Sequence, residues 1–366
     1  MKTGKSLIEL ATELQRQSES RKDYHAPQGA LVAQLAVDPA DETRTEFVAL
    51  AGLNGAPVQP TAFAHKQIAD DLGIPTKYYE RMLVDRPRLL VENVNTWLQA
   101  EPKRTRLVRT LDGKARAWLS GSYRPLDNFE LAESVLPVLS EMGTQVESLE
   151  LTETRLYIKA TYPALQTEIE GSRTKGDIVR AGIVISNSEV GNGALRIEPL
   201  IFRLICLNGM IAADASMKKY HLGQRASFDE AVREVLTDRT KQADDVAFWM
   251  KVRDVVRASF NVDLFKALAD RLSKATQDVI VSDDLPKVVD VTVKRLALPE
   301  AVGGGLLKAL ASGGDFSRFG LLNAITSLAN TQVDYEVATV LERAGGQVLE
   351  LKPQDWKVIS EGRAQA

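Results

Sequence analysis

The feature that most constrains the fold is the Asp112-Gly113 dipeptide, which stands between two runs of alternating apolar and polar residues. A two-residue hairpin loop needs positive φ at both central positions, so Asp-Gly is a strong hairpin signal. The register that follows from such a loop places Arg109 opposite Arg116. Residues 104–120 are therefore predicted to form two antiparallel strands.

This register gathers cationic and aromatic side chains on one face of the hairpin. The face carries Arg109, Lys114, Arg116 and Trp118, whereas small and apolar residues occupy the other. Like charges directly opposite each other destabilise a sheet unless something acidic or anionic lies over them. A phosphate backbone with stacking bases would meet that requirement. Carboxylates from elsewhere in the chain, such as Glu147 or Glu150, would meet it equally well.

The stretch from residue 183 to 221 is expected to supply the central strands. Asn187-Ser188 and Gly191-Asn192-Gly193 signal turns, and an alternating strand follows them. The polar side chains of this stretch could form a surface that binds a ligand. Alternatively, they stabilise the turns through hydrogen bonds to the backbone, and one arginine pairs with Glu198. The second interpretation is the simpler one. The side chains concerned are Asn187, Glu189, Arg196 and Arg203.

Composition limits the classes of protein to be considered. With 366 residues, two subdomains are expected. The 46 basic and 49 acidic side chains give a net charge of −3, so any nucleic-acid site must be a local patch. The single cysteine excludes an internal disulfide, and its apolar surroundings favour a buried, inert Cys206 thiol. The N-terminus lacks the apolar core of a signal peptide and no apolar run reaches membrane-spanning length, so a cytoplasmic protein without a membrane partner is expected.

The first hundred residues are expected to form a helical arm and layer. Apolar spacing predicts a helix from Ser6 to Gln17, and residues 18–43 are expected to be a partly ordered arm that packs on a neighbour. Three short helices follow, starting at Thr61, Pro75 and Pro87. The second carries Tyr78 and Tyr79, which could stack a base but are more typical of a core pair.

The remaining pattern indicates an antiparallel sheet around a helix, followed by helices. Asp127 and Glu130 predict a capping box, and residues 145–161 a second hairpin. The Gly303-Gly304-Gly305 triplet predicts a hinge or tight turn, and Gly345-Gly346 is expected to end the last helix before a short strand. We therefore expect an α+β fold, with an antiparallel sheet built from hairpins around a helix and a helical C-terminal domain. The expected units are 1–100 (helical arm and layer), 101–225 (sheet core) and 226–366 (mainly helical).

Several of these segments resemble a known family. SGSYRPLDNFELAESVLPVLSEMG, SNSEVGNGALRIEPLIFRLICLNGM, FGLLNAITSLANT and LERAGGQVLEL are similar to the phage and plasmid family catalogued as domain of unknown function 932, over about residues 106–351. The resemblance implies a setting beside recombination and single-strand-binding genes, and the element order is similar to that of single-strand annealing proteins. The family has no established activity to transfer. The matching positions are Ser120, Tyr123, Leu126, Asp127, Asn128, Asn187, Ser188, Gly191, Arg203, Cys206, Asn208, Gly209 and His221.

Motifs for catalysis and cofactors are not matched. His25, His65 and His221 lack partners at metal-binding spacing, and the sequence contains neither a Gly-x-Ser-x-Gly elbow nor His-Glu-x-x-His. The acidic pairs Asp244-Asp245 and Asp283-Asp284 leave a metal-dependent nuclease as an alternative. A binding function without a cofactor is favoured over an enzyme.

The sequence therefore predicts a nucleic-acid-binding protein of phage or plasmid DNA metabolism and recombination. It would bind single-stranded DNA in a cationic groove, with annealing as an extension of that activity and with a homo-oligomer adding avidity. Phage or host replication and recombination proteins are further expected partners. The alternative is a regulatory protein of a mobile element that binds a host or phage protein. The expected DNA-binding residues are Arg109, Lys114, Arg116, Trp118, Tyr123, Arg124, Arg196, Arg203, Lys218, Lys219 and Tyr220.

Overall fold

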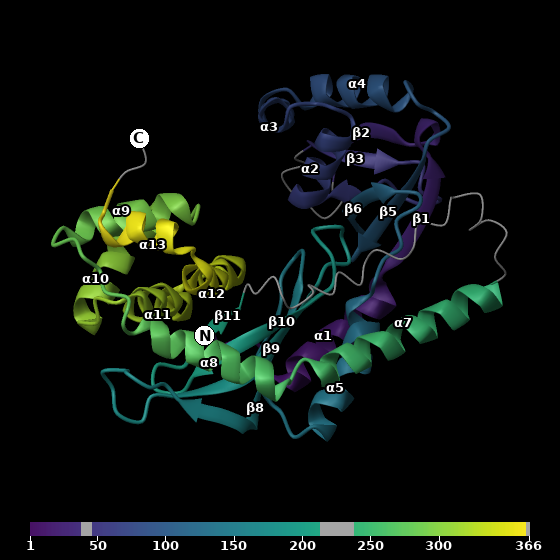
Figure 1. The fold of residues 1–366 in the computed structure, drawn as a ribbon. Coiled ribbons are helices and arrows are strands. Elements are labelled where there is room, and N and C mark those ends of the chain that lie inside the picture. Colours follow the sequence, from purple (N-terminus) through teal and green to yellow (C-terminus); the bar gives the residue numbers. More distant parts are fainter. Residues whose placement is uncertain (38–45, 213–237, 364–366) are drawn as a thin grey trace.

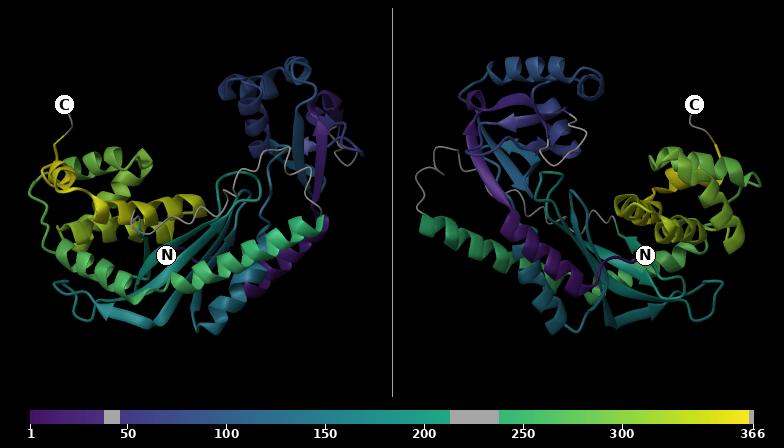
Figure 2. Two further views of the ribbon diagram at one scale, coloured as in Figure 1. Left: turned by 45° about the vertical axis from the view of Figure 1, so that its right-hand side comes forward. Right: turned by 180° about the vertical axis from the view of Figure 1, so that it is seen from behind.

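A computed structural model describes residues 1–37, 46–212 and 238–363 of the chain (Figure 1). The α+β class and the helical C-terminal region are confirmed. Sheets of four, five and two strands and a group of helices make up the described part. Figure 2 shows an N-terminal unit and the C-terminal helices standing at opposite ends of the central sheet, on the same side of it.

The N-terminal unit has a four-stranded sheet in the order β1-β5-β6-β4 and a separate β2–β3 hairpin. Its elements are β1 (Lys22–Pro27), β2 (Val32–Val37), β3 (Glu46–Ala51), β4 (Gln59–Pro60), α2 (Ala62–Asp71), α3 (Thr76–Asp85), α4 (Pro87–Leu98), β5 (Thr105–Leu111) and β6 (Lys114–Ser120), with a 3-10 turn at Gln28–Ala30. Because β1 pairs with β5, part of the expected arm is a strand of this chain's own sheet. The expected boundary at residue 100 consequently falls inside this unit.

The predicted hairpin turn is confirmed, but the register beyond it is wrong. Asp112 and Gly113 have φ of 50° and 75°, as the turn requires. A β-bulge next to Arg109 then makes Arg116 an extra residue, so that Arg109 lies opposite Ala117. The shift leaves the two arginines out of direct opposition.

The central sheet is antiparallel, in the order β11-β10-β9-β8-β7. Its strands are β7 (Gln145–Leu151), β8 (Leu156–Glu168), β9 (Ile178–Asn187), β10 (Arg196–Arg203) and β11 (Asn208–Ile211). One face is apolar and packs against α1 (Leu7–Ser20), α5 (Asn128–Glu141) and α7 (Asp238–Ala258). The other face carries polar side chains beside α12 (Tyr335–Glu350), including Lys159, which pairs with Glu342 at 2.5 Å.

The start of α5 differs from the prediction in one contact. Asp127 occupies the N-cap position, but its side chain makes no capping hydrogen bond. The carboxylate instead binds Arg109 at 2.7 Å and also binds Arg21. Two guanidinium groups are stronger partners for a carboxylate than a backbone N–H.

The C-terminal region is helical. It comprises α8 (Val262–Ala275), α9 (Leu285–Arg295), α10 (Gly303–Gly313), α11 (Arg318–Leu328), α12 and α13 (Pro353–Ser360), with 3-10 turns at Glu300–Val302 and Ala329–Thr331. The glycine triplet opens α10 and forms no hinge. Helix α12 continues through Gly345-Gly346 to Glu350, so the expected short strand is absent from this segment.

Candidate nucleic-acid interface

The expected cationic face of the β5–β6 hairpin points into the molecule. Arg109 is 1% exposed, and its guanidinium donates to Asp23 at 2.8 Å, to Asp127 at 2.7 Å and to the carbonyl oxygen of Glu189 at 2.8 Å. Arg116 is 7% exposed and donates to the carboxylate of Glu189 at 3.0 Å. Of the two balancing partners that the sequence left open, an anionic ligand or acidic side chains, acidic side chains are present. They come from β1, α5 and the segment after β9, and not from Glu147 or Glu150.

Trp118 is also internal, whereas Lys114 is exposed. The Trp118 ring is buried, its Nε1 donates to Asp71 at 2.9 Å, and the Arg106 guanidinium lies 5.8 Å from its centroid. Stacking of a base on this ring would require the unit to open. The interpretation of this hairpin face as an exposed DNA-binding surface is thus wrong, because carboxylates of the chain itself already neutralise Arg109 and Arg116 inside the molecule.

The remaining candidate residues do not converge on one groove. Tyr123 is half-buried beside Leu119, and burial raises the pKa of its hydroxyl. Arg124 pairs with Asp244 at 3.3 Å and with Asp245, which gives this acidic pair a partner. Lys218, Lys219 and Tyr220 lie outside the described residues.

Arg203 is the last residue of β10, and Cys206 lies in the turn that follows this strand. Arg203 binds Asp177 at 2.6 Å and lies over the Phe319 ring at 5.2 Å. The expected burial of Cys206 is wrong, because its residue is exposed in the turn after the strand, where Arg203 Nη1 lies 3.5 Å from Sγ. The apolar run continues to Leu207, but β10 ends at Arg203, and Ile205 and Leu207 on either side of the cysteine are exposed as well.

An exposed aromatic residue with cationic neighbours does occur, on α3 and α4. Tyr79 is 2% exposed and shares a 2.8 Å hydrogen bond with Nδ1 of His65. Tyr78 is 47% exposed, although it is the adjacent residue. Successive helical side chains point about 100° apart, so one of the two tyrosines joins the core and the other faces outward.

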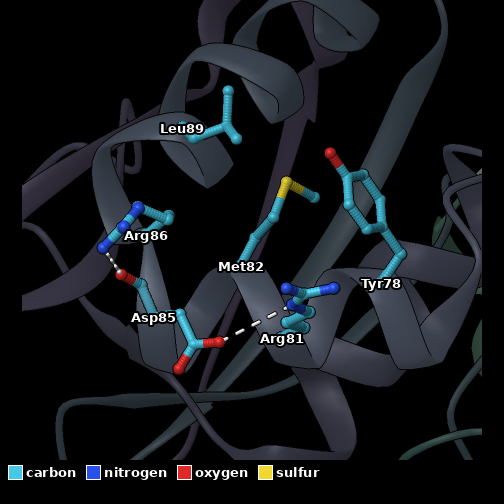
Figure 3. Close-up of a pocket in the computed structure, with 6 residues that line it drawn as sticks. All are labelled: Tyr78, Arg81, Met82, Asp85, Arg86 and Leu89. Carbon is cyan, nitrogen blue, oxygen red and sulfur yellow. Dashed lines mark hydrogen bonds and ion pairs between the residues drawn. The ribbon is translucent and has the colours of Figure 1, made fainter.

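Tyr78 borders an open hollow of about 450 Å³ between the two helices (Figure 3). Figure 3 shows Tyr78 and Arg86 on opposite sides of Met82, which is buried. Arg81 Nε lies 3.7 Å from a carboxylate oxygen of Asp85 in a well-exposed pair, and Arg86 donates to the backbone oxygen of Asp85 at 3.0 Å. The lining residues are Tyr78, Arg81, Met82, Asp85, Arg86 and Leu89.

Sequence reasoning missed Arg81 and Arg86, although a signal was present. Tyr78, Arg81 and Asp85 are spaced three and four residues apart, which places them on one helix face. Residues 76–104 carry six basic and four acidic side chains, a local charge of +2 against −3 for the whole chain. Residues 76–98 of this segment form the α3–α4 surface, with four basic and three acidic side chains, and combine a stacking ring with cations.

Some residues of the family motifs, among them Asn128, Asn187 and Ser188, lie at the junction between the two sheets. Asn187 donates to the Leu126 carbonyl at 2.7 Å and to Asn128 Oδ1 at 2.9 Å, and Glu189 accepts from the backbone N–H of Asn128 at 2.6 Å. Ser188 Oγ accepts from the backbone N–H of Asn192 at 2.8 Å. These hydrogen bonds connect the segment after β9 with the start of α5 at this junction.

A family model described as "Domain of unknown function (DUF932)" matches residues 117–279. The match covers 163 of the 366 residues and supports the DUF932 family for this segment. Comparison with curated proteins and with solved structures found no match. The DUF932 segment begins within β6 and ends after α8, so it contains the central sheet and most of the junction. The α3–α4 surface precedes it.

The described residues were also considered as possible metal ligands and as possible membrane-spanning helices. Within the described ranges, no three His, Cys, Asp or Glu side chains are grouped so that they could hold a metal ion. None of the helices in the same ranges has the length and apolarity needed to cross a membrane.

Proposed function

We propose that this protein binds nucleic acid, specifically single-stranded DNA, through the α3–α4 surface. The observation that carries the proposal is the half-exposed Tyr78 ring beside Arg81 and Arg86 at one hollow. An accessible ring can stack on an unpaired base, and guanidinium groups bind the backbone phosphates. Paired bases are hidden in a duplex, so the ring favours single strands.

The proposal also covers the cellular process in which the protein would bind DNA. The DUF932 resemblance supports a role in phage or plasmid DNA metabolism and recombination in the cytoplasm, next to replication and recombination proteins. A charge of +2 over residues 76–104 supports only a weak contact per chain. Homo-oligomer formation would add such contacts along one strand.

Fluorescence anisotropy with labelled single- and double-stranded oligonucleotides tests the proposal at low and moderate salt. Tyr78→Ala should weaken single-strand binding by about tenfold, since stacking is worth roughly 1–3 kcal/mol per base. Arg81→Ala/Arg86→Ala should weaken binding similarly and reduce its salt dependence.

The matched control is Lys251→Ala/Arg253→Ala, which removes the same charge from two exposed positions on α7. This control should bind as the unaltered protein does. Equal losses in both double variants would show a net-charge effect and overturn the α3–α4 surface. An intact protein that binds neither strand form at low salt would overturn nucleic-acid binding altogether.

A protein partner is the second candidate function, and exposed apolar side chains on the same helices favour it. Val84 is 80% exposed, Trp97 50% and Leu89 44%. Neighbouring apolar residues of this kind are common at protein interfaces. Under this alternative, Trp97→Ala would abolish co-purification of a defined partner and leave oligonucleotide binding unchanged.

A further inference from the structure

A row of polar side chains crosses the polar face of the central sheet. Tyr157 on β8 pairs with Ser186 on β9, which pairs in turn with Arg196 on β10. Directly opposed residues of an antiparallel sheet share a face, with their Cβ atoms about 5 Å apart. The hydroxyl of Ser186 therefore lies between the phenol ring and the guanidinium group.

Three buried donors in this region have no hydrogen-bond partner in the structure. They are Ser186 Oγ, Arg196 Nε and Arg343 Nε, and Ser186 itself is 0% exposed. Leaving one such group unsatisfied costs about 1–3 kcal/mol. Several at one place indicate a missing acceptor.

Two more arginines bring positive charge to the row. Arg343 of α12 pairs with Glu198, two residues beyond Arg196 on β10. Arg155, just before β8, donates to the backbone oxygen of Asn192. Burial lowers the pKa of Arg155, and the proximity of Arg196 and Arg343 lowers it further. The three guanidinium groups thus crowd one another.

The carboxylates nearby do not balance this charge. Glu198 is engaged by Arg343, and Glu336 accepts hydrogen bonds from the hydroxyls of Thr154 at 2.7 Å and Thr152 at 3.2 Å. Glu150, opposite Tyr157 on β7, pairs with Lys5 at 3.7 Å. With this pair included, four cations face three anions, which leaves an excess of +1. Among the described residues, Arg196 makes no hydrogen bond or ion pair with another side chain.

The neighbouring row of the same sheet face shows that the excess is local. There Lys159 is 0% exposed and pairs with Glu342 at 2.5 Å. In the same row Ser148 shares a 2.7 Å hydrogen bond with the Tyr335 hydroxyl. In this row the lysine has its counter-charge, and the buried atom left without a partner is an acceptor, Glu342 Oε1, whereas the atoms left unpartnered at Arg196 are donors.

We propose that Arg155, Ser186, Arg196 and Arg343 form a phosphate-binding site. Guanidinium groups bind phosphate oxygens through paired N–H donors, and a serine hydroxyl supplies a further donor. The phosphate group belongs either to a small molecule, such as inorganic phosphate or a nucleotide, or to a nucleic-acid backbone. The site stands apart from the α3–α4 surface and does not depend on it.

Isothermal titration calorimetry of the full chain with inorganic phosphate, a deoxynucleoside monophosphate and an oligonucleotide without a terminal phosphate tests the site. Arg196→Gln should weaken binding of the phosphate-bearing probe by tenfold or more, and Ser186→Ala by several-fold. Arg180→Gln is the matched control, because this arginine is on β9 but already donates to Gln166 and Gln145. The control should bind as the unaltered protein does.

The possible outcomes distinguish the two sources of the phosphate group. They also distinguish the phosphate site from the proposed DNA binding at the α3–α4 surface. Binding of inorganic phosphate or the monophosphate identifies a small-molecule site, whereas binding of the oligonucleotide alone identifies a backbone site. Arg81→Ala/Arg86→Ala should retain inorganic phosphate binding even if it loses DNA. No binding of any probe at millimolar concentration overturns the site, as does unchanged binding by both Arg196→Gln and Ser186→Ala. Ser186→Ala removes a hydroxyl that has no hydrogen-bond partner, so this variant should fold. It therefore still tests the site if Arg196→Gln does not fold.

Discussion

Arg109 and Tyr78 occupy environments opposite to those that their local sequence favours. Arg109 stands in an alternating strand among other cations, yet it is 1% exposed and is held by carboxylates of β1 and α5. Tyr78 looked like half of a core pair, yet it is 47% exposed. Each side chain was assigned by residue type and spacing, whereas its exposure depends on elements that arrive from elsewhere in the chain.

His65 illustrates the same dependence and yields a prediction about pH. Burial beside Tyr79 lowers the His65 pKa from 6.5 to about 4. Between these values the unfolded chain binds a proton that the folded chain does not, so stability falls as the pH is lowered through 6.5 towards 4. From pH 7.5 to 5 this residue should remove roughly 2 kcal/mol from the free energy of unfolding.

Urea unfolding at the two pH values measures the loss. His65→Phe should be less sensitive to this pH change than the unaltered protein, even if it is less stable at both values. Equal sensitivity of the two proteins would show that His65 is not the group responsible.

At the scale of elements, glycines that look alike in sequence have opposite roles. Gly303 and Gly304 lie in the first turn of α10, and a Cβ added to either would meet nothing within 4 Å. Gly345 lies inside α12, where a Cβ would come within 2.4 Å of Thr326 Cγ2 on α11. Thr326 is buried and donates to the Leu322 carbonyl, so it cannot move aside freely. The Gly345 position thus permits the close approach of two helices.

Replacing these glycines by alanine should change stability in opposite directions. Gly304→Ala should raise the free energy of unfolding by about 0.5–1 kcal/mol, because alanine favours the helix. Gly345→Ala should lower it by about 1–3 kcal/mol, because overpacking outweighs the gain in helix propensity. Chemical denaturation of both variants beside the unaltered protein is the measurement. A stabilised Gly345→Ala variant would contradict the close α11–α12 contact.

At the scale of the molecule, the buried ion network around Glu189 joins the N-terminal sheet to the central sheet. Glu189 accepts from Arg116 of β6 and from the N–H of Asn128 at the start of α5, while Arg109 of β5 reaches its carbonyl oxygen. These contacts span elements far apart in sequence. The orientation of the N-terminal unit therefore depends on a few charged groups, of which Glu189 lies in the DUF932 segment and Arg109 and Arg116 precede it.

Glu189→Gln should destabilise the protein by about 3 kcal/mol, because it leaves Arg116 buried without a compensating charge. Thermal or urea unfolding, together with limited proteolysis near residue 121, should show the N-terminal unit loosening first. Glu133→Gln, at an exposed position of α5, is the matched control and should change stability little. A Glu189→Gln protein as stable as this control would refute the role of the network.

The sequence by itself determined the elements that depend on neighbouring residues. The Asp112-Gly113 turn, the α+β class, the helices started by Thr61 and Pro87, and the helical C-terminal region all follow from backbone preference and short-range apolar spacing. Such signals act over a few residues and survive any tertiary arrangement. They also indicated that a cationic strand needed either acidic side chains or an anionic ligand beside it.

Only the tertiary structure decided which carboxylates those partners are and which surface stays open. The β-bulge beside Arg109, the pairing of β1 with β5 and the position of Glu189 turned the expected DNA-binding face into a junction. The same packing left Tyr78 exposed and placed unpartnered donors of Ser186, Arg196 and Arg343 together. The physical reason is that burial and charge balance sum over groups distant in the chain, and local spacing carries no information about them.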